Sequence, residues 1–549
     1  MTKNSNNLTY NNKITYGIQY IKGRKFKESE NCFKEAIKID SVKSEAYINL
    51  SNLYILDNKK ITALKVLKEY LVQNSFNETI ANHLGKICIN YDFKNELFEL
   101  LHLANVTKDK ISKDRYYLYF IFGKFLQKNK NFSSAVNAYK NSIKCKKDFF
   151  ESFFRIFYLL ETTNDLINLE KYINIAADIF YEKKQIHIIN FYRAIFFNRK
   201  KDFKLSEEII KDNNLETHLN FNTNLYIRLH DLLSKNNEKL NKFSKSFHYV
   251  EKRNQLMFNL EENKNYNRKD IINTMKQYKS FFTFEKYNKI KSISEKIKSE
   301  KKLVFLVGFP RSGTTLLDTI LRTHSRITVL EEKPYLLEAR HDFFLKHNND
   351  LNALLDISES EIVQIRDNYF NKFRKEFSDE NNIIIDKLPL SIIEIGFIKS
   401  IFPNSKFILA LRHPCDVVIS CYFSFFSINE AMINFLNWED TIDFYNNVFT
   451  LFEFYENELK LDYFRIKYED LIADFEKNIT HLLSFLGLKY ENDLKNFNLT
   501  AKKRDKISTP SYSQVINPLY STSIGRWKNF SKNKSAKTDL IKWIDKFNY

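Results

Sequence analysis

The residues best suited to chemistry lie in a short loop between an apolar run and a helix-patterned segment. Residues 303–307 are apolar, Gly308 ends the run, and residues 309–315 read Phe-Pro-Arg-Ser-Gly-Thr-Thr. The segment that follows has apolar residues at helical spacing, namely Leu316, Leu317, Ile320 and Leu321. A glycine-bounded loop that opens a helix presents backbone N–H groups and the positive end of the helix dipole to an anion. The sequence therefore predicts an oxyanion site in this loop, formed by Arg311, Ser312, Gly313, Thr314 and Thr315.

This loop differs from the phosphate loop of NTP-hydrolysing enzymes. Those loops carry Gly-Lys-Ser/Thr at the start of the helix. Here Thr314 follows Gly313 where the lysine would stand, and the cation of the loop is Arg311. We therefore do not expect the bound oxyanion to be the γ-phosphate of ATP.

Two more cationic residues follow predicted strands. A short apolar strand over 382–386 leads to Lys387, and a second over 406–411 leads to Arg412. A helix predicted from Asp416 onward carries Ser420, so a guanidinium and a hydroxyl could hold one anion together. Strands that alternate with helices indicate an α/β domain with a mostly parallel sheet, and ligands bind beyond the carboxyl ends of such strands. We expect the loop, Lys387 and Arg412 to meet at that edge.

The part of the chain before residue 250 has an internal period of 34 residues. Small residues recur at Gly17, Ser51 and Gly85. Weaker units have matching residues at Gly123, Leu126, Ala135 and Tyr139, and at Ala194, Phe197, Ser206 and Ile210. This pattern resembles the tetratricopeptide repeat, a solenoid of stacked helix pairs. We predict an all-α repeat domain over 8–265, a helical connector over 266–300 and a second domain over 301–549; an irregular helical domain is the alternative for the first part.

Composition narrows the class of protein. The chain has 549 residues with only 9 Gly and 7 Pro, which favours several domains and a largely helical fold. The net charge of +19 is spread along the chain, so nucleic acid is not an expected partner. The five cysteines lack metal-ligand or paired spacing, and we expect reduced thiols and no metal. No apolar stretch approaches the roughly 18 residues of a membrane span, so we expect no membrane insertion and a cytoplasmic location.

Five ordered segments carry a resemblance to a known family. They are GFPRSGTTLL, DKLPL, FPNSKFILALRHPCDVVIS, KYEDL and SQVINPLYSTSIGRWKNF. Together they resemble the sulfotransferases that use 3′-phosphoadenosine 5′-phosphosulfate (PAPS), in particular the branch with N-terminal tetratricopeptide repeats, whose core is similar to tyrosylprotein sulfotransferases. The resemblance covers about residues 302–549. It implies a P-loop-like α/β domain that moves a sulfuryl group from PAPS to an acceptor hydroxyl.

The resemblance also implies roles for individual residues. The loop 311–315 would hold the phosphosulfate, while Arg412 and Ser420 would hold the 3′-phosphate. Lys387 and Arg311 would stabilise the charge that develops during transfer. Further cofactor-binding positions implied by the match are Tyr468, Ser511, Arg526 and Trp527.

The acceptor hydroxyl needs a general base within hydrogen-bond reach. The family's base follows the phosphate loop, and Glu332 has the matching spacing, eight residues after His324 and twenty-one after Arg311. The adjacent Glu331 is the alternative. On a helix, neighbouring side chains point about 100° apart, so only one of the two would face the site.

Two other functions are compatible with parts of the sequence. A P-loop-like kinase or NTPase would require a lysine after Gly313 and a metal site. A repeat-based binding protein with a degenerate catalytic domain would have broken cofactor motifs. The acceptor stays open between a peptide tyrosine, a glycan and a small molecule, and we expect the repeats to aid its recognition, with a peptide or carrier-bound substrate as the favoured partner.

Overall fold

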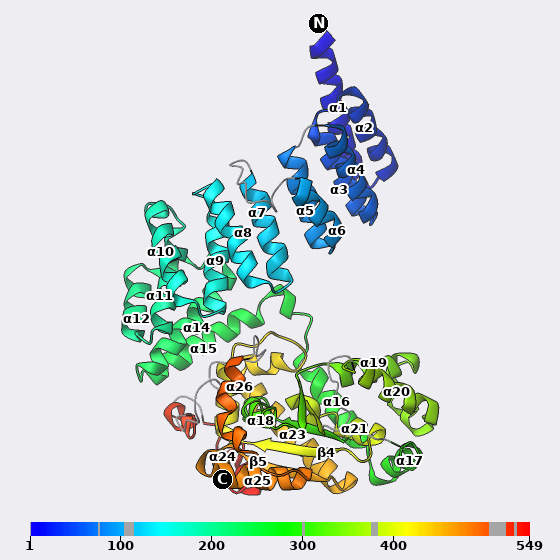
Figure 1. The fold of residues 1–549 in the computed structure, drawn as a ribbon, viewed down its shortest axis with the longest axis vertical. Helices are drawn as coiled ribbons and strands as arrows, with labels where there is room; N and C mark the ends of the chain where they lie inside the picture. Colours follow the sequence, from blue (N-terminus) through cyan, green and yellow to red (C-terminus); the bar gives the residue numbers. More distant parts are fainter. Residues whose placement is uncertain are drawn as a thin grey trace. The chain divides into compact units, whose positions relative to one another are not determined.

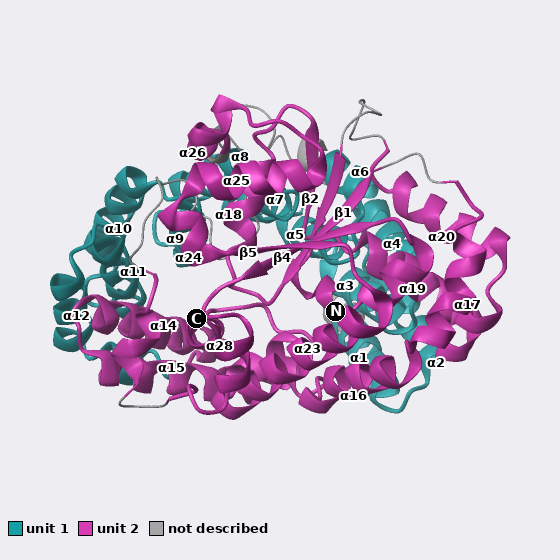
Figure 2. Cartoon of the chain, turned by 90° about the horizontal axis from the view of Figure 1, so that it is seen from below, with its two compact units in different colours: residues 1–220 teal, residues 221–549 magenta. Residues whose placement is uncertain are grey.

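The computed structural model describes residues 2–74, 77–103, 115–298, 302–374, 383–503, 523–531 and 535–549. The chain divides into two compact units, residues 1–220 and residues 221–549 (Figure 2). The described elements of the N-terminal unit are all helices, and the C-terminal unit contains a β-sheet (Figure 1). The predicted order of an all-α solenoid followed by an α/β domain is confirmed.

The helices of the N-terminal unit pack as consecutive antiparallel pairs. They are α1 (Thr2–Lys22), α2 (Phe26–Ile39), α3 (Ser44–Leu56), α4 (Lys60–Gln73), α5 (Glu78–Asn90), α6 (Lys94–Leu103), α7 (Tyr116–Lys128), α8 (Phe132–Cys145), α9 (Phe150–Thr162), α10 (Leu166–Phe180), α11 (Ile186–Arg199), α12 (Phe203–Asp212) and α13 (Leu215–His218).

One hydrogen bond recurs within these pairs and explains the small residues of the repeat. The Ser29 hydroxyl on α2 donates to the Gly17 carbonyl on α1, at 2.8 Å and across twelve residues. Ser206 on α12 donates to the Ala194 carbonyl on α11 at the same separation, at 2.7 Å. In the α3–α4 pair the direction is reversed, and the Ser51 hydroxyl on α3 donates to the Ala63 carbonyl on α4, at 3.2 Å. Small side chains allow the two helices to approach closely enough for this bond, so the period reports helix-pair packing.

The C-terminal unit contains five strands in its described part. They are β1 (Leu303–Gly308), β2 (Ile327–Glu331), β3 (Ile383–Lys387), β4 (Lys406–Leu411) and β5 (Tyr463–Lys467). The helices are α14 (Thr223–Lys239), α15 (Phe243–Phe258), α16 (Arg268–Phe281), α17 (Phe284–Ser294), α18 (Thr314–Leu321), α19 (Tyr335–Lys346), α20 (Glu359–Asn371), α21 (Ile395–Ile401), α22 (Pro414–Phe423), α23 (Trp438–Leu459), α24 (Tyr468–Ala473), α25 (Phe475–Leu486), α26 (Phe497–Lys503) and α28 (Ile541–Lys546).

The strands form one parallel sheet in the order β2-β3-β1-β4-β5. The central strand β1 is buried along its whole length, as a strand covered on both faces requires. Its odd-numbered residues, such as Phe305, belong to one hydrophobic core, and Val304 and Leu306 belong to the core on the other face. Strand β1 connects through α18 to β2 on one side, whereas its neighbour β4 connects to β5 on the other. This change of direction marks the edge between β1 and β4 as the expected ligand position.

A helical pair, α14–α15, belongs to the C-terminal unit. Its internal contact repeats that of the N-terminal pairs, since the Ser246 hydroxyl donates to the Ser234 carbonyl across twelve residues at 2.9 Å. Phe247 and Val250 of α15 nevertheless belong to the same hydrophobic core as Phe305 of the sheet. The proposed boundaries at residues 265 and 300 stay predictions.

Three further features concern the cysteines, membrane spans and metal sites. All five cysteines, Cys32, Cys88, Cys145, Cys415 and Cys421, are free thiols. Among the described helices, none is long and apolar enough to cross a membrane. The described residues include no cluster of three or more His, Cys, Asp or Glu side chains arranged to hold a metal ion.

Candidate functional site

The predicted loop begins at the end of β1, beside β4. Gly308, the last residue of β1, pairs with Ala410 of β4. A Cβ atom at position 308 would lie 2.6 Å from the Ala410 carbonyl oxygen, so only glycine permits this approach. The loop therefore starts at the edge between the two strands whose connections diverge.

Two left-handed residues fold the loop onto the start of α18. Arg311 has φ of 71° and Gly313, the residue before the helix, has φ of 92°. The backbone N–H groups of Leu316 and Leu317 donate to the Gly313 carbonyl, which starts the helix. The first N–H groups of an α-helix have no acceptor within the helix, so a helix N-terminus such as that of α18 favours an anion.

The structure brings Arg311, Arg412 and Ser420 together beside this loop. Arg311 Nε donates to the Ser420 hydroxyl at 3.1 Å, and Arg412 Nη1 donates to the Arg311 carbonyl at 3.3 Å. Arg412 is only 7% exposed, and its Nε has no hydrogen-bond partner among the described residues. A buried guanidinium N–H without a partner is costly, whereas an anionic ligand would satisfy it.

Tyr468 closes the loop from the side of β5. It is the first residue of α24, and its ring lies 3.0 Å from where a Cβ on Gly313 would stand. The Arg412 guanidinium lies 5.4 Å from the centre of this ring. The Tyr468 hydroxyl is hydrogen-bonded to Ser523 Oγ at 2.9 Å, and Arg412 also donates to the Ser523 carbonyl. Tyr468 therefore contacts both the loop and the buried arginine.

The segment with Arg526 and Trp527 is attached to the N-terminus of α22. The fully buried Asp416 accepts hydrogen bonds from the Trp527 N–H at 2.9 Å and the Gly525 N–H at 2.7 Å. The Trp527 side chain stacks on the His413 ring, with centroids 5.4 Å apart, and burial lowers the pKa of His413. Asp416 thus holds the backbone on both sides of Arg526 at the N-terminal end of α22.

The Arg526 guanidinium makes a two-pronged ion pair with Glu238 of α14, with Nε–Oε1 and Nη2–Oε2 distances of 2.6 and 2.8 Å. Burial alone would raise the pKa of Glu238, but the Arg526 charge holds it below its usual value. The sequence contained no signal for this partner, which lies 288 residues away. Ser511, the remaining predicted cofactor residue, lies outside the described residues.

The predicted base lies in a second cluster centred on Lys387. The Lys387 ammonium is fully buried and lies 2.9 Å from Glu332 Oε1, 3.7 Å from Glu331 Oε1 and 3.7 Å from Asp318 Oδ2. Both glutamates therefore contact the lysine. On a helix, the two glutamate side chains would point about 100° apart. They do not lie on a helix, because Glu331 ends strand β2 and Glu332 follows it in a left-handed turn with φ of 47°.

Glu332 is the more accessible of the two glutamates. Its side chain is 32% exposed, against 10% for Glu331. The Glu332 N–H donates to the Lys387 carbonyl at 2.8 Å, which fixes the turn to the end of β3. Glu332 thus combines an ion pair to Lys387 with access to solvent.

Asp318 was not predicted and completes this cluster. It lies on α18, four residues after Thr314, and its fully buried carboxylate pairs with Arg322 at 2.8 Å. The spacing of Asp318 and Arg322 was visible as an ordinary helical ion pair, and nothing in the sequence linked it to Lys387. The adjacent Asp386 accepts a hydrogen bond from the Tyr369 hydroxyl at 2.7 Å, and burial raises its pKa to about 7.

Several comparisons with known proteins point to sulfotransferases. Residues 304–492 match the model of the sulfotransferase family. The chain is 26% identical to an uncharacterized protein of Aquifex aeolicus over 376 residues, which cover 65% of this chain and 47% of that protein. It is 24% identical to protein-tyrosine sulfotransferase 2 of Gallus gallus over 243 residues, which cover 42% of this chain and 63% of that protein.

A solved structure, the sulfotransferase domain from the curacin biosynthetic pathway, is 16% identical, with 45% of this chain and 98% of that chain covered and a TM-score of 0.32. The chain spans between about half and two thirds of the length of the two curated relatives described above.

Proposed function

We propose that this protein transfers a sulfuryl group from PAPS to an acceptor hydroxyl, because residues 304–492 match the model of the sulfotransferase family. The observation that carries the proposal is the group of Arg311, Arg412 and Ser420 at the start of α18, with the buried Arg412 Nε lacking a partner among the described residues. Two anionic groups of one nucleotide fit such a site, one at the helix N-terminus and one at Arg412.

Each residue has a defined place in this proposal. The N–H groups and hydroxyls of residues 312–315 hold the 5′-phosphosulfate, and Arg412 with Ser420 holds the 3′-phosphate. Arg526, Trp527 and Tyr468 line the nucleotide, as does Ser511 by the family match. The ring of Tyr468 beside Arg412 supports this arrangement, since an aromatic face and a guanidinium suit an adenosine bisphosphate.

In the proposed reaction, the acceptor oxygen attacks the sulfur in line with the leaving group. The new S–O bond forms as the bond to the bridging phosphate oxygen breaks, and adenosine 3′,5′-bisphosphate leaves. The hydroxyl proton passes to Glu332. Lys387 and Arg311 stabilise the charge that develops on the bridging oxygen. The 2.9 Å contact between Lys387 and Glu332 supports this arrangement, because it holds the proposed base beside the proposed charge-stabilising group.

The acceptor part of the proposal rests on the helical array. We assign the repeats of residues 1–220 to the recognition of a peptide or carrier-bound acceptor. The relatives named as protein-tyrosine sulfotransferases favour a peptide tyrosine over a glycan or a small metabolite.

A thermal-shift titration of the full chain tests the donor. Adenosine 3′,5′-bisphosphate at about 100 times its Kd should stabilise the protein by about 2.7 kcal/mol, a rise in Tm of about 4 °C for a unit of the size of residues 221–549. Arg412→Gln should reduce this rise, whereas Arg465→Gln, a matched change at an exposed position on β5, should leave it unchanged. A shift with MgATP and none with the bisphosphate would contradict the proposal and favour a kinase or NTPase.

A further inference from the structure

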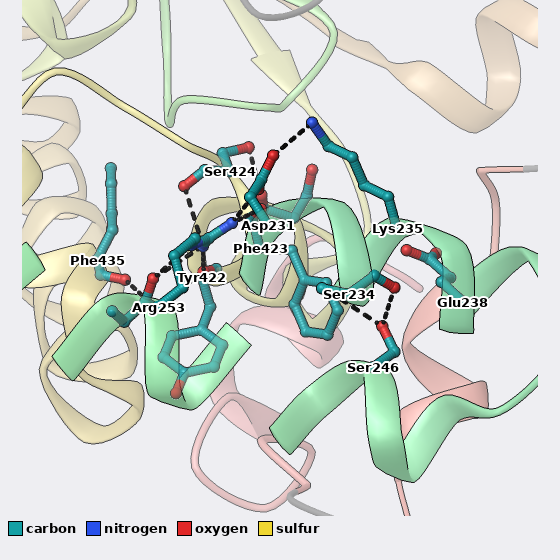
Figure 3. Close-up of polar contacts among 12 residues, drawn as sticks. Asp231, Ser234, Lys235, Glu238, Ser246, Arg253, Tyr422, Phe423, Ser424 and Phe435 are labelled. Carbon is teal, nitrogen blue, oxygen red and sulfur yellow. Dashed lines mark hydrogen bonds and ion pairs between the residues drawn. The ribbon is translucent and has the colours of Figure 1, made fainter. Parts of the chain in front are cut away.

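The helical pair α14–α15 is joined to the proposed donor site by two groups of polar contacts, of which Figure 3 shows the group around Arg253. One group holds the C-terminal end of α22, the helix that carries Ser420. The other is the ion pair between Glu238 of α14 and Arg526. Neither contact could be read from the sequence, because each connects residues at least 168 positions apart.

Arg253 of α15 makes the first group of contacts. Its side chain is 1% exposed, and it donates to the Tyr422 carbonyl at 3.1 Å and the Phe423 carbonyl at 3.0 Å. These two residues end α22, whose last carbonyl groups have no partner within the helix. A cation at a helix C-terminus is also favoured by the helix dipole. Arg253 therefore caps α22 three residues after Ser420.

Two neighbours of Arg253 complete its hydrogen bonding (Figure 3). Asp231 of α14 accepts from Arg253 Nη1 at 2.7 Å. Burial alone would raise the pKa of Asp231, but the charges of Lys235 and Arg253 hold it below its usual value. Asn254 accepts from Arg253 Nε at 3.0 Å and donates to the Tyr422 carbonyl at 3.1 Å. The hairpin is therefore fixed to the end of α22 by a satisfied, buried network.

The second contact orients a residue of the proposed donor site. Arg526 lies with its guanidinium 4.8 Å from the centre of the Phe423 ring and 5.6 Å from that of Phe530. Glu238 takes one N–H from Nε and one from Nη2, so three of the five guanidinium N–H groups remain for other partners. The two rings and the carboxylate together restrict the side chain to one orientation.

We propose that Glu238, on a helical pair anchored to α22 by Arg253, is a positioning residue that holds Arg526 ready for the phosphate groups of the donor nucleotide. The inference rests on the proposed function. It assigns the last helical pair to donor binding, whereas the preceding repeats serve the acceptor. If the Arg526 side chain is ordered before the nucleotide binds, binding does not have to include the entropy cost of ordering it. That cost is equivalent to about two- to ten-fold in Kd.

Calorimetric titration of the full chain with adenosine 3′,5′-bisphosphate tests this role. Glu238→Gln should weaken binding by about two- to ten-fold, the ordering cost named above. Glu251→Gln removes the same charge from an exposed position on α15 and should leave Kd unchanged. In an Arg526→Gln background, Glu238→Gln should have no further effect, since two residues that act through one contact are not additive.

Other outcomes would refute either the positioning role of Glu238 or the proposed function. Unchanged or tighter binding by Glu238→Gln refutes the positioning role. A loss of affinity on Glu238→Gln that is as large in the Arg526→Gln background as in the wild-type background refutes it too. A wild-type protein that does not bind adenosine 3′,5′-bisphosphate refutes the proposed function instead. Tm without ligand, measured for every variant, separates a loss of folding from a loss of binding.

Discussion

Replacing Lys387 with methionine should destabilise the C-terminal unit as well as abolish transfer. The Lys387 side chain is fully buried, and three carboxylates lie within 3.7 Å of its ammonium, those of Asp318, Glu331 and Glu332. Methionine has a similar volume, so the substitution removes the charge and leaves little cavity. The effect therefore reports the electrostatics of this cluster.

The magnitude follows from the charges that remain. Arg322 still pairs with Asp318, so the variant chiefly removes the ammonium that contacts Glu331 and Glu332. Removal of one partner from a buried ion pair costs about 3–5 kcal/mol. Since the Glu332 side chain is 32% exposed and partly screened by water, we expect a loss near the lower limit, about 3 kcal/mol.

Urea unfolding followed by tryptophan fluorescence is a suitable assay. The chain has three tryptophans, Trp438, Trp527 and Trp543, and all of them lie in the C-terminal unit. The signal therefore reports that unit alone. Lys333→Met, at an exposed position next to the cluster, is the matched control and should change stability by less than about 0.5 kcal/mol. A Lys387→Met variant within about 1 kcal/mol of wild type would refute the reasoning, which sets the cost at about 3 kcal/mol.

Three further predictions concern the same unit. Glu332→Gln should retain binding of adenosine 3′,5′-bisphosphate but slow transfer by about 10²–10⁴-fold. If Glu332→Gln keeps full activity and Glu331→Gln instead shows this loss of transfer, the base is Glu331. The folded-state pKa of Asp386 is raised from 3.8 to about 7, so its stabilising proton is lost as pH rises through 7. Asp386→Asn should therefore gain about 1–3 kcal/mol relative to wild type between pH 5 and pH 8, measured by urea unfolding, and a pH-independent difference would contradict this pKa. Gly308→Ala should cost about 1–3 kcal/mol, because its Cβ would meet the Ala410 carbonyl, and wild-type stability would count against that clash.

Local patterns predicted the elements that carry the site. The strand before Gly308 and the strand before Arg412 were visible as apolar runs, and the helix with Ser420 began near the expected residue. The 34-residue period predicted the helix pairs, because it reflects the small residues that allow two helices to touch. The resemblance to sulfotransferases is confirmed by the family match over residues 304–492.

Contacts between distant segments could not be predicted in the same way. Strand β2, which ends at Glu331, has the polar residue Thr328 among its five residues, and the pattern did not distinguish it from a loop. The pairing of Asp318 with Lys387 depends on how α18 packs beside β3, which no local spacing encodes. Glu238 and Arg526 meet only because a helical pair packs against the α/β core.

Sulfate transfer from ³⁵S-labelled PAPS tests the central claim most directly. The full chain should be incubated with labelled PAPS and fractionated cell extract, with Glu332→Gln in parallel. The account predicts label in a discrete acceptor with the wild-type protein and a loss of at least about 100-fold with the variant. Absence of labelled acceptor in every fraction, or equal labelling by the two proteins, would contradict it.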